Sequence, residues 1–125
     1  MTYLKKQIRP EISSILKTKI FSAEEKFQNE TLRPIIKLQH ELILSYFKHY
    51  VERNKINISS LSFSQKTDLT KNLFNTDTRL KTELRGLIIG LFTLEEYKDY
   101  VSLSSHLNKR INTMIQQRID SSYVK

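Results

Sequence analysis

Residues 32–54 have the sequence LRPIIKLQHELILSYFKHYVERN, which gives the clearest indication of how this chain folds. On a helix, which turns by about 100° per residue, the apolar side chains of this stretch cover well over half of the circumference. A narrow polar strip remains, formed by Lys37, Glu41, Ser45, Lys48 and Glu52. A helix with so wide an apolar face is expected to run through the middle of a bundle, with other helices packed around it.

Helix starts are marked on both sides of this stretch. Capping boxes, in which Ser or Thr precedes Glu or Gln by three residues, begin at Ser22, Ser62 and Thr93, and a turn over residues 75–77 ends in the helix cap Asp77. The capping box at Thr93 opens a helix from Leu94 to about Asp120, with Ser104-Ser105 as the candidate position of a bend. Further apolar stripes predict helices after Ser62 and after Asp77.

Pro34 divides the region between Ser22 and Asn54. A proline is tolerated in the first turn of a helix and is disruptive later, because it lacks an N–H and crowds the preceding turn. We therefore expect a short helix to about Glu30, a kink, and then one long helix to about Asn54.

The composition favours an all-α protein. The 125 residues include two glycines and two prolines, which are few for a loop-rich β protein, and no segment alternates with a period of two. We predict a single compact helical bundle of five or six helices with one long central helix. The chain is expected to form one domain over 1–125, in which 1–21 are a basic amphipathic N-terminal helix and 22–125 form the bundle core.

Positive charge is concentrated at the N-terminus. The 21 Lys and Arg exceed the 13 Asp and Glu by eight, and half of this excess lies in residues 1–21. The same segment has an apolar stripe at helical spacing, formed by Ile8, Ile12, Ile15 or Leu16, and Ile20. Such a helix suits an anionic membrane surface or nucleic acid, but we favour the simpler interpretation that its stripe closes one side of the bundle.

Several classes of protein are excluded or disfavoured. The chain contains no cysteine, so it has no disulfide framework, Cys-based zinc finger, iron–sulfur cluster or thiol nucleophile. Its longest strongly apolar run, residues 86–94, is far below the roughly 20 residues that a spanning helix needs. No targeting segment is recognised, and a cytoplasmic location is expected.

Both glycines, Gly86 and Gly90, fall inside a predicted helix and four residues apart. Interior glycine costs roughly 0.5–1 kcal/mol relative to alanine, so the pair needs an explanation. In order of preference, the explanations are close approach of another helix, a left-handed cap at Gly90, and a ligand pressed against the backbone.

No arrangement of residues indicates catalysis or a metal. His40 and His49 are nine residues apart and face opposite sides of a helix, and His106 stands alone, so no metal site or cofactor is predicted. A glycine-rich phosphate loop and a nucleophile elbow are both missing from the sequence. Whether the protein is an enzyme stays open, although the sequence favours a protein without catalytic activity. The preferred hypothesis is a non-catalytic binding or regulatory module.

Nucleic-acid binding is the alternative hypothesis. The net charge of +8 attracts phosphate, and residues 68–85 resemble a helix-turn-helix unit whose second helix would begin near Arg79 and Lys81. The candidate contacts are Lys5, Lys6, Arg9, Arg79 and Lys81. Adjacent helices joined by a tight turn also occur in any helical bundle.

A ligand site, if present, is expected where polar groups meet the aromatic-rich helices. The candidate binding residues are Arg33, Gln39, His40, Tyr46, Asn108 and Arg110. Each also has an ordinary structural role available, such as an ion pair, a bond to neighbouring backbone, or a place in the core. A protein partner or a homodimer is a third possibility. The last helix has an apolar face whose first residue is Tyr97, and this face suits a dimer seam as well as a core.

Three segments are similar to a family of short, all-helical bacterial proteins: FQNETLRPIIKLQ at 27–39, GLIIGLFTLEEY at 86–97 and SSHLNKR at 104–110. The resemblance covers most of the chain from about residue 22. Proteins of this family are often labelled "glyoxalase" without an established role, so the resemblance implies a small helical protein and, through that label alone, a lyase. The glyoxalase I type has His and Glu metal ligands on strands, and the hydrolase type has a His-x-His-x-Asp-His motif. Neither pattern occurs here, and no catalytic residue is transferred.

Overall fold

The computed structural model describes the backbone of residues 22–124 and the side chains of residues 22–122. Within this part of the chain every regular element is helical and no strand occurs. The elements are α2 (Ala23–Phe27), η1 (Gln28–Leu32), α3 (Arg33–Leu38), α4 (His40–Arg53), α5 (Phe63–Thr76), α6 (Thr78–Ile89), α7 (Leu94–Ile119) and η2 (Asp120–Val124), where η denotes a π-helical turn. The predicted all-α class is confirmed. The N-terminal helix expected at 1–21 lies outside the described residues.

The predicted caps start four of these helices. Each of the side chains of Ser22, Ser62, Asp77 and Thr93 accepts a hydrogen bond from the backbone N–H three residues later. At Ser62 and Thr93 the bond is reciprocated by the Gln or Glu side chain, which completes the capping box. These bonds satisfy N–H groups that have no partner inside the helix, and so they fix where each helix begins.

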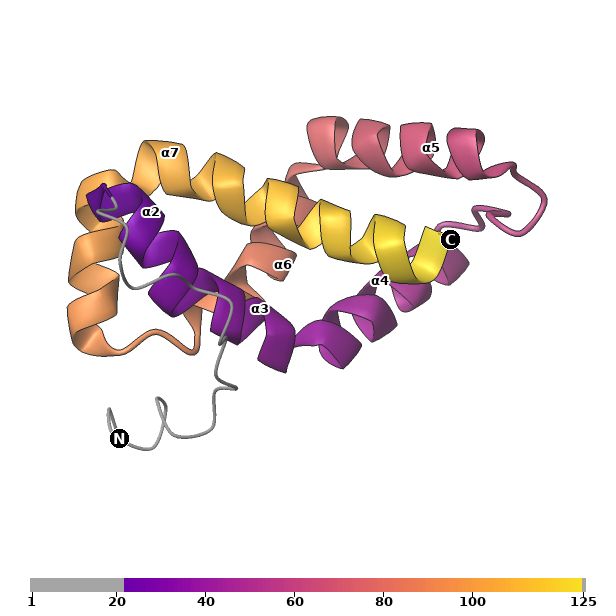
Figure 1. Ribbon diagram of the computed structural model, residues 1–125. Coiled ribbons are helices and arrows are strands. Elements are labelled where there is room, and N and C mark those ends of the chain that lie inside the picture. Colours follow the sequence, from indigo (N-terminus) through magenta and orange to yellow (C-terminus); the bar gives the residue numbers. More distant parts are fainter. Residues whose placement is uncertain (1–21, 125) are drawn as a thin grey trace.

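The helix predicted over 32–54 is present as two segments, because it is interrupted at Gln39. The backbone there has φ −88° and ψ 9°, which lies outside the helical region. The side-chain amide of Gln39 donates to the carbonyl oxygen of Leu87 on α6 at 3.0 Å. Figure 1 shows the change of direction between α3 and α4 at this point. The interruption therefore coincides with a polar contact to the helix on which this region packs.

The kink expected just before Pro34 is replaced by the π-helical turn η1. Here the N–H of Arg33 bonds to the carbonyl oxygen of Gln28, five residues earlier. Because proline supplies no N–H and its ring crowds the carbonyl four residues earlier, the wider turn lets the chain continue into α3 without a break. The position of the predicted kink was wrong, since the helix breaks at Gln39 instead.

Helix α7 is 26 residues long and bends in its orange part (Figure 1). Its first part contacts α2, and its second part runs along α4 and α5. Across the bend the hydroxyl of Tyr100 donates to Oδ1 of Asn108, eight residues later. On a straight helix these positions are about 12 Å apart along the axis. The small side chain of Ser104 lies between them in the sequence, in agreement with a bend at Ser104-Ser105.

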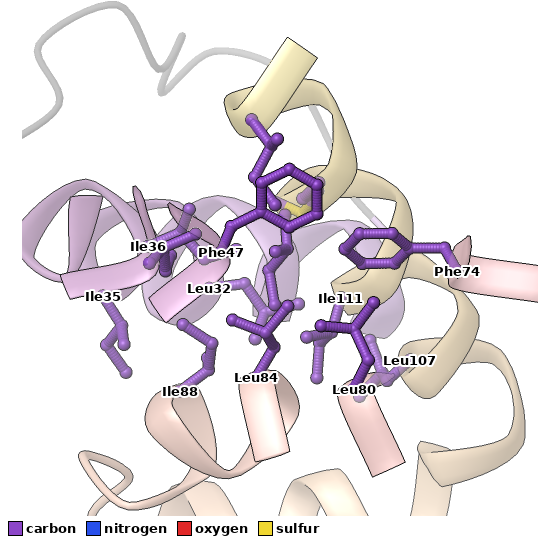
Figure 2. Close-up of a cluster of buried hydrophobic side chains, with 14 of the residues drawn as sticks. Leu32, Ile35, Ile36, Phe47, Phe74, Leu80, Leu84, Ile88, Leu107 and Ile111 are labelled. Carbon is purple, nitrogen blue, oxygen red and sulfur yellow. The ribbon is translucent and has the colours of Figure 1, made fainter. Parts of the chain in front are cut away.

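The core lies against one face of α6 and is filled by aliphatic and aromatic side chains of the other helices. Leu80, Leu84 and Ile88, spaced four apart on α6, are at most 1% exposed. Figure 2 shows them facing side chains of η1, α3, α4, α5 and α7, including Leu32, Ile35, Ile36, Phe47, Phe74, Leu107 and Ile111. Because α6 presents this face to the core, its opposite face points to solvent.

The two glycines lie on that opposite face, and within the described residues the structure contradicts both preferred explanations for them. A Cβ atom at Gly86 would meet nothing within 4 Å, so no helix packs closely there among the described residues. Gly90 follows the last residue of α6 with φ −60°, which is not left-handed. A Cβ there would lie 3.2 Å from the carbonyl oxygen of Gly86, a tight contact with the turn of the same helix. The third explanation, a ligand against the backbone, remains untested.

Candidate functional site

A pocket of about 270 Å³ opens where the turn between α5 and α6 meets the end of α4. Two tyrosines, two arginines and one carboxylate give it its chemical character. Its lining consists of Tyr46, Tyr50, Arg53, Asn54, Asp77, Arg79 and Leu80. Together with Glu83, which bonds to two of these side chains, they form what we call the tyrosine–carboxylate pocket.

Tyr50 and Asp77 join α4 to the start of α6. The hydroxyl of Tyr50 donates to Oδ2 of Asp77, while Oδ1 of Asp77 accepts the N–H of Leu80 at 3.0 Å and caps the helix. Tyr50 is only 6% exposed, and its ring stacks on that of Phe47 with centroids 6.2 Å apart. One carboxylate thus serves as a helix cap and as the acceptor for a nearly buried phenol.

Tyr46 lies one helical turn before Tyr50 and bonds to the next carboxylate. Its hydroxyl donates to Oε2 of Glu83 at 2.5 Å, and Nε of Arg79 donates to Oε1 of the same carboxylate at 2.6 Å. The guanidinium of Arg53 lies over the ring of Tyr50, 6.0 Å from its centroid. Each carboxylate therefore accepts from two donors of the protein, whereas Arg53 makes no ion pair within residues 22–122.

Burial and these bonds move the pKa values of the pocket groups away from neutrality. Burial, helped by the neighbouring carboxylate, raises the pKa of Tyr46 and of Tyr50 to about 12. The bond from Tyr50 lowers the pKa of Asp77, and the bonds from Tyr46 and Arg79 lower that of Glu83. At pH 7 both hydroxyls are donors and both carboxylates are ionised. A general acid or base works best with a pKa near the operating pH, and these four groups lack that property.

The two tyrosines are expected to make the protein sensitive to alkali. Their pKa rises from about 10, the ordinary value, to about 12 on folding. The folded state therefore keeps protons that the unfolded chain releases, so stability is full below pH 10 and falls as the pH rises toward 12. An ultraviolet titration of tyrosinate should show a late step near pH 12.

The late step should disappear in a variant with Tyr46→Phe and Tyr50→Phe, and it should persist in the control Tyr97→Phe, which alters a half-exposed ring outside the pocket. If the wild-type protein shows no ionisation later than about pH 10, the hydroxyl–carboxylate bonds are not present in solution.

The residues predicted from sequence are only partly brought together. Tyr46 and Arg79, chosen for different hypotheses, both line the pocket, while Lys81 is half-buried outside its lining. The others make separate contacts: Arg33 with Asn29, Gln39 with Leu87, Asn108 with Tyr100, and Arg110 with Gln28. Lys5, Lys6 and Arg9 lie outside the described residues.

His40 stays apart from the pocket as well. It is half-buried, and its Nδ1 atom is buried without a hydrogen-bond partner in the structure. It does not line the tyrosine–carboxylate pocket. The six candidate binding residues therefore do not form one site.

Six residues of the pocket were not expected from the sequence as site residues: Tyr50, Arg53, Asn54, Asp77, Leu80 and Glu83. Tyr46 and Tyr50 are four residues apart on one helix face, and Asp77 was recognised as a cap. The spacing alone could have suggested a pair of tyrosines. Tyr50 reaches the helix cap Asp77, 27 residues later, only because α4 packs against α6.

Two features are absent from the part of the chain that the structure describes. No group of three or more His, Cys, Asp or Glu side chains in this part could hold a metal ion. None of its helices is both long and apolar enough to cross a membrane. No protein-family model, curated protein or solved structure matches the chain. The resemblance to small helical bacterial proteins consequently remains a prediction.

Proposed function

We propose that this protein is a small non-catalytic binding module whose tyrosine–carboxylate pocket holds an anionic group of its ligand. The observation behind the proposal is that Asp77 and Glu83 each accept two donors of the protein, while Arg53 makes no ion pair within residues 22–122. Fixed donors and fixed charges suit recognition, whereas proton transfer near pH 7 needs a group that gains and loses its proton there. A cytoplasmic location, expected because no targeting segment is recognised in the sequence, is part of the same proposal.

The choice of an anion follows from which groups keep hydrogen-bonding capacity. Asp77 and Glu83 each accept from two donors of the protein, as described above. The guanidinium of Arg53 contacts only an aromatic face, and Arg79 uses Nε for Glu83 and keeps its terminal N–H groups. Unused donors therefore outnumber unused acceptors. Guanidinium groups bind carboxylate and phosphate oxygens in a fork geometry, so these are the ligand groups we expect.

Binding of inorganic phosphate and of succinate, followed by amide chemical shifts, tests this proposal. The shifts should map to the end of α4 and the start of α6. Arg53→Gln should weaken binding about 10-fold or more, because a hydrogen bond to a charged group contributes about 1.5–3 kcal/mol. The matched control is Lys48→Gln, which removes one exposed positive charge from the same helix outside the pocket.

An equal loss in both variants would indicate general charge attraction and contradict a specific pocket. The absence of any shift at millimolar phosphate or succinate would also contradict a specific pocket.

An assay with lactoylglutathione and added zinc or nickel tests the glyoxalase label. Robust turnover would overturn the non-catalytic part of the proposal.

Nucleic-acid binding is less well supported. Residues 22–124 contain 15 Lys and Arg against 12 Asp and Glu, a balance of only +3 of the total +8. The start of α6 offers Arg79, but this side chain is paired with Glu83 and lies beside Asp77. Labelled duplex DNA and single-stranded RNA across a salt series would reveal this activity, since phosphate contacts give an affinity that falls steeply with salt.

A further inference from the structure

A second groove, of about 270 Å³, lies between α2–η1 and the first part of α7. Its apolar lining includes the buried ring of Phe27 and the half-buried side chain of Leu103. Its charged lining consists of two carboxylates on opposite sides, Glu30 from η1 and Asp99 from α7, and one cation, Lys26 from α2, and all three residues are exposed. Figure 1 shows α2 beside this part of α7, at the end of the molecule away from α5. We call this feature the acidic groove.

The helices that form the acidic groove have an excess of negative charge in a basic protein. Residues 22–32 contain three Glu and one Lys, and residues 94–103 contain two Glu, one Asp and one Lys. These two segments together have a net charge of −4, while the whole chain has +8. A local charge of sign opposite to that of the whole molecule attracts a basic partner.

The chain itself contains a segment of complementary charge that ends at this groove. Residues 1–21 have five Lys and Arg against one Glu, a net charge of +4, and apolar residues Ile8, Ile12 and Leu16 at helical spacing. The segment is continuous with Ser22, the cap of α2, and the next residue, Ala23, already lines the groove. A short tether of this kind gives an effective concentration in about the millimolar range.

We propose that residues 1–21 dock in the acidic groove, with their isoleucine and leucine side chains against Phe27 and Leu103 and their cations facing Glu30 and Asp99. The segment reaches the groove by reversing direction just before Ser22, which a connection of about two to five residues allows between antiparallel helices. The docked segment covers the half-buried side chain of Leu103 and the edge of the groove at Phe27. High salt releases it, since the Debye length falls from about 10 Å at 0.1 M to about 3 Å at 1 M.

Paramagnetic broadening of amide signals in the full chain tests this docking. Because the chain has no cysteine, a single introduced cysteine gives a unique attachment point for a nitroxide. Ser105→Cys places the label on α7 close to the groove without lining it, and Ser64→Cys places it at the start of α5, at the other end of the molecule in Figure 1. We expect loss of amide signals from residues 8–16 with the first label and their retention with the second.

Charge reversal separates docking from accidental proximity. Glu30→Lys with Asp99→Lys should restore the lost signals, and the matched control Glu41→Lys with Glu52→Lys, two exposed carboxylates on α4, should not. Adding Lys5→Glu, Lys6→Glu and Arg9→Glu to the groove variant should bring the broadening back. All reversed side chains within residues 22–122 are exposed, and an unchanged circular dichroism spectrum confirms that each variant folds.

Three results would overturn the proposal. Equal broadening by both labels would mean that residues 1–21 have no preferred position. Broadening that survives reversal of Glu30 and Asp99 would place the segment elsewhere. Broadening in a mixture of isotope-labelled chains without nitroxide and unlabelled chains with nitroxide would show that the segment docks on a second copy instead of its own groove.

Discussion

Replacement of Phe47 by alanine is expected to lower the free energy of unfolding by about 3–5 kcal/mol. The side chain is fully buried and belongs to the cluster of core side chains in Figure 2. Its ring also stacks on Tyr50 with an interplanar angle of 18°, so the cavity would reach the wall of the tyrosine–carboxylate pocket. Urea unfolding followed by circular dichroism measures the change. A domain of this size has about 5–15 kcal/mol in total, so the variant should remain folded but marginal.

The control is Phe63→Ala, which removes the same atoms from a ring that is 60% exposed at the start of α5. We expect this change to cost less than about 1 kcal/mol, since most of the ring is already in water. Equal costs for the two variants would contradict the burial of Phe47 in the core.

Most helix starts could be predicted because they depend on neighbouring residues. The capping boxes at Ser62 and Thr93 are bonds between residues three apart, and the sequence displays both partners. The interruption at Gln39 could not be predicted in the same way. Its amide reaches the backbone of Leu87, 48 residues later, and the hydrophobic pattern of residues 32–54 continues through it unchanged. Contacts between distant segments decided where the helix breaks.

The glycine pair shows the limit of arguments from residue type. Two glycines four apart on a helix suggest a close neighbour. The spacing of Leu80, Leu84 and Ile88 places Gly86 on the outer face of α6, but whether another helix covers that face depends on the packing. The candidate site, too, is determined by how the helices pack. Tyr46 was chosen as an aromatic near polar residues, but its acceptor Glu83 belongs to another helix. Residue types can indicate a polar aromatic cluster, whereas its members are selected by tertiary packing.

Asp77 is the residue whose loss should affect the candidate site most. Asp77→Ala removes the cap of α6, which costs about 0.5–2 kcal/mol, and it leaves the nearly buried hydroxyl of Tyr50 without its acceptor, which costs about 1–3 kcal/mol. We expect a total loss of about 2–4 kcal/mol at pH 7. The pKa of Asp77 is lowered on folding, so its ionised form stabilises the protein at neutral pH. This contribution should fade as the pH falls below about 4, the ordinary value of an aspartate.

A double-mutant cycle separates the two roles of Asp77. In a Tyr50→Phe background the phenol is absent, so Asp77→Ala should cost only the cap, and the difference between the two backgrounds is the coupling between tyrosine and carboxylate. Ser62→Ala is the matched control for a cap alone, because Ser62 is exposed and caps α5 by the same bond without a second partner from another helix. Asp77→Asn should be milder than Asp77→Ala, since asparagine caps helices equally well and its carbonyl still accepts from Tyr50. If Asp77→Ala costs no more than Ser62→Ala, Asp77 acts only as a helix cap. The hydrogen bond from Tyr50 to Asp77, which joins α4 to α6, then does not stabilise the folded protein.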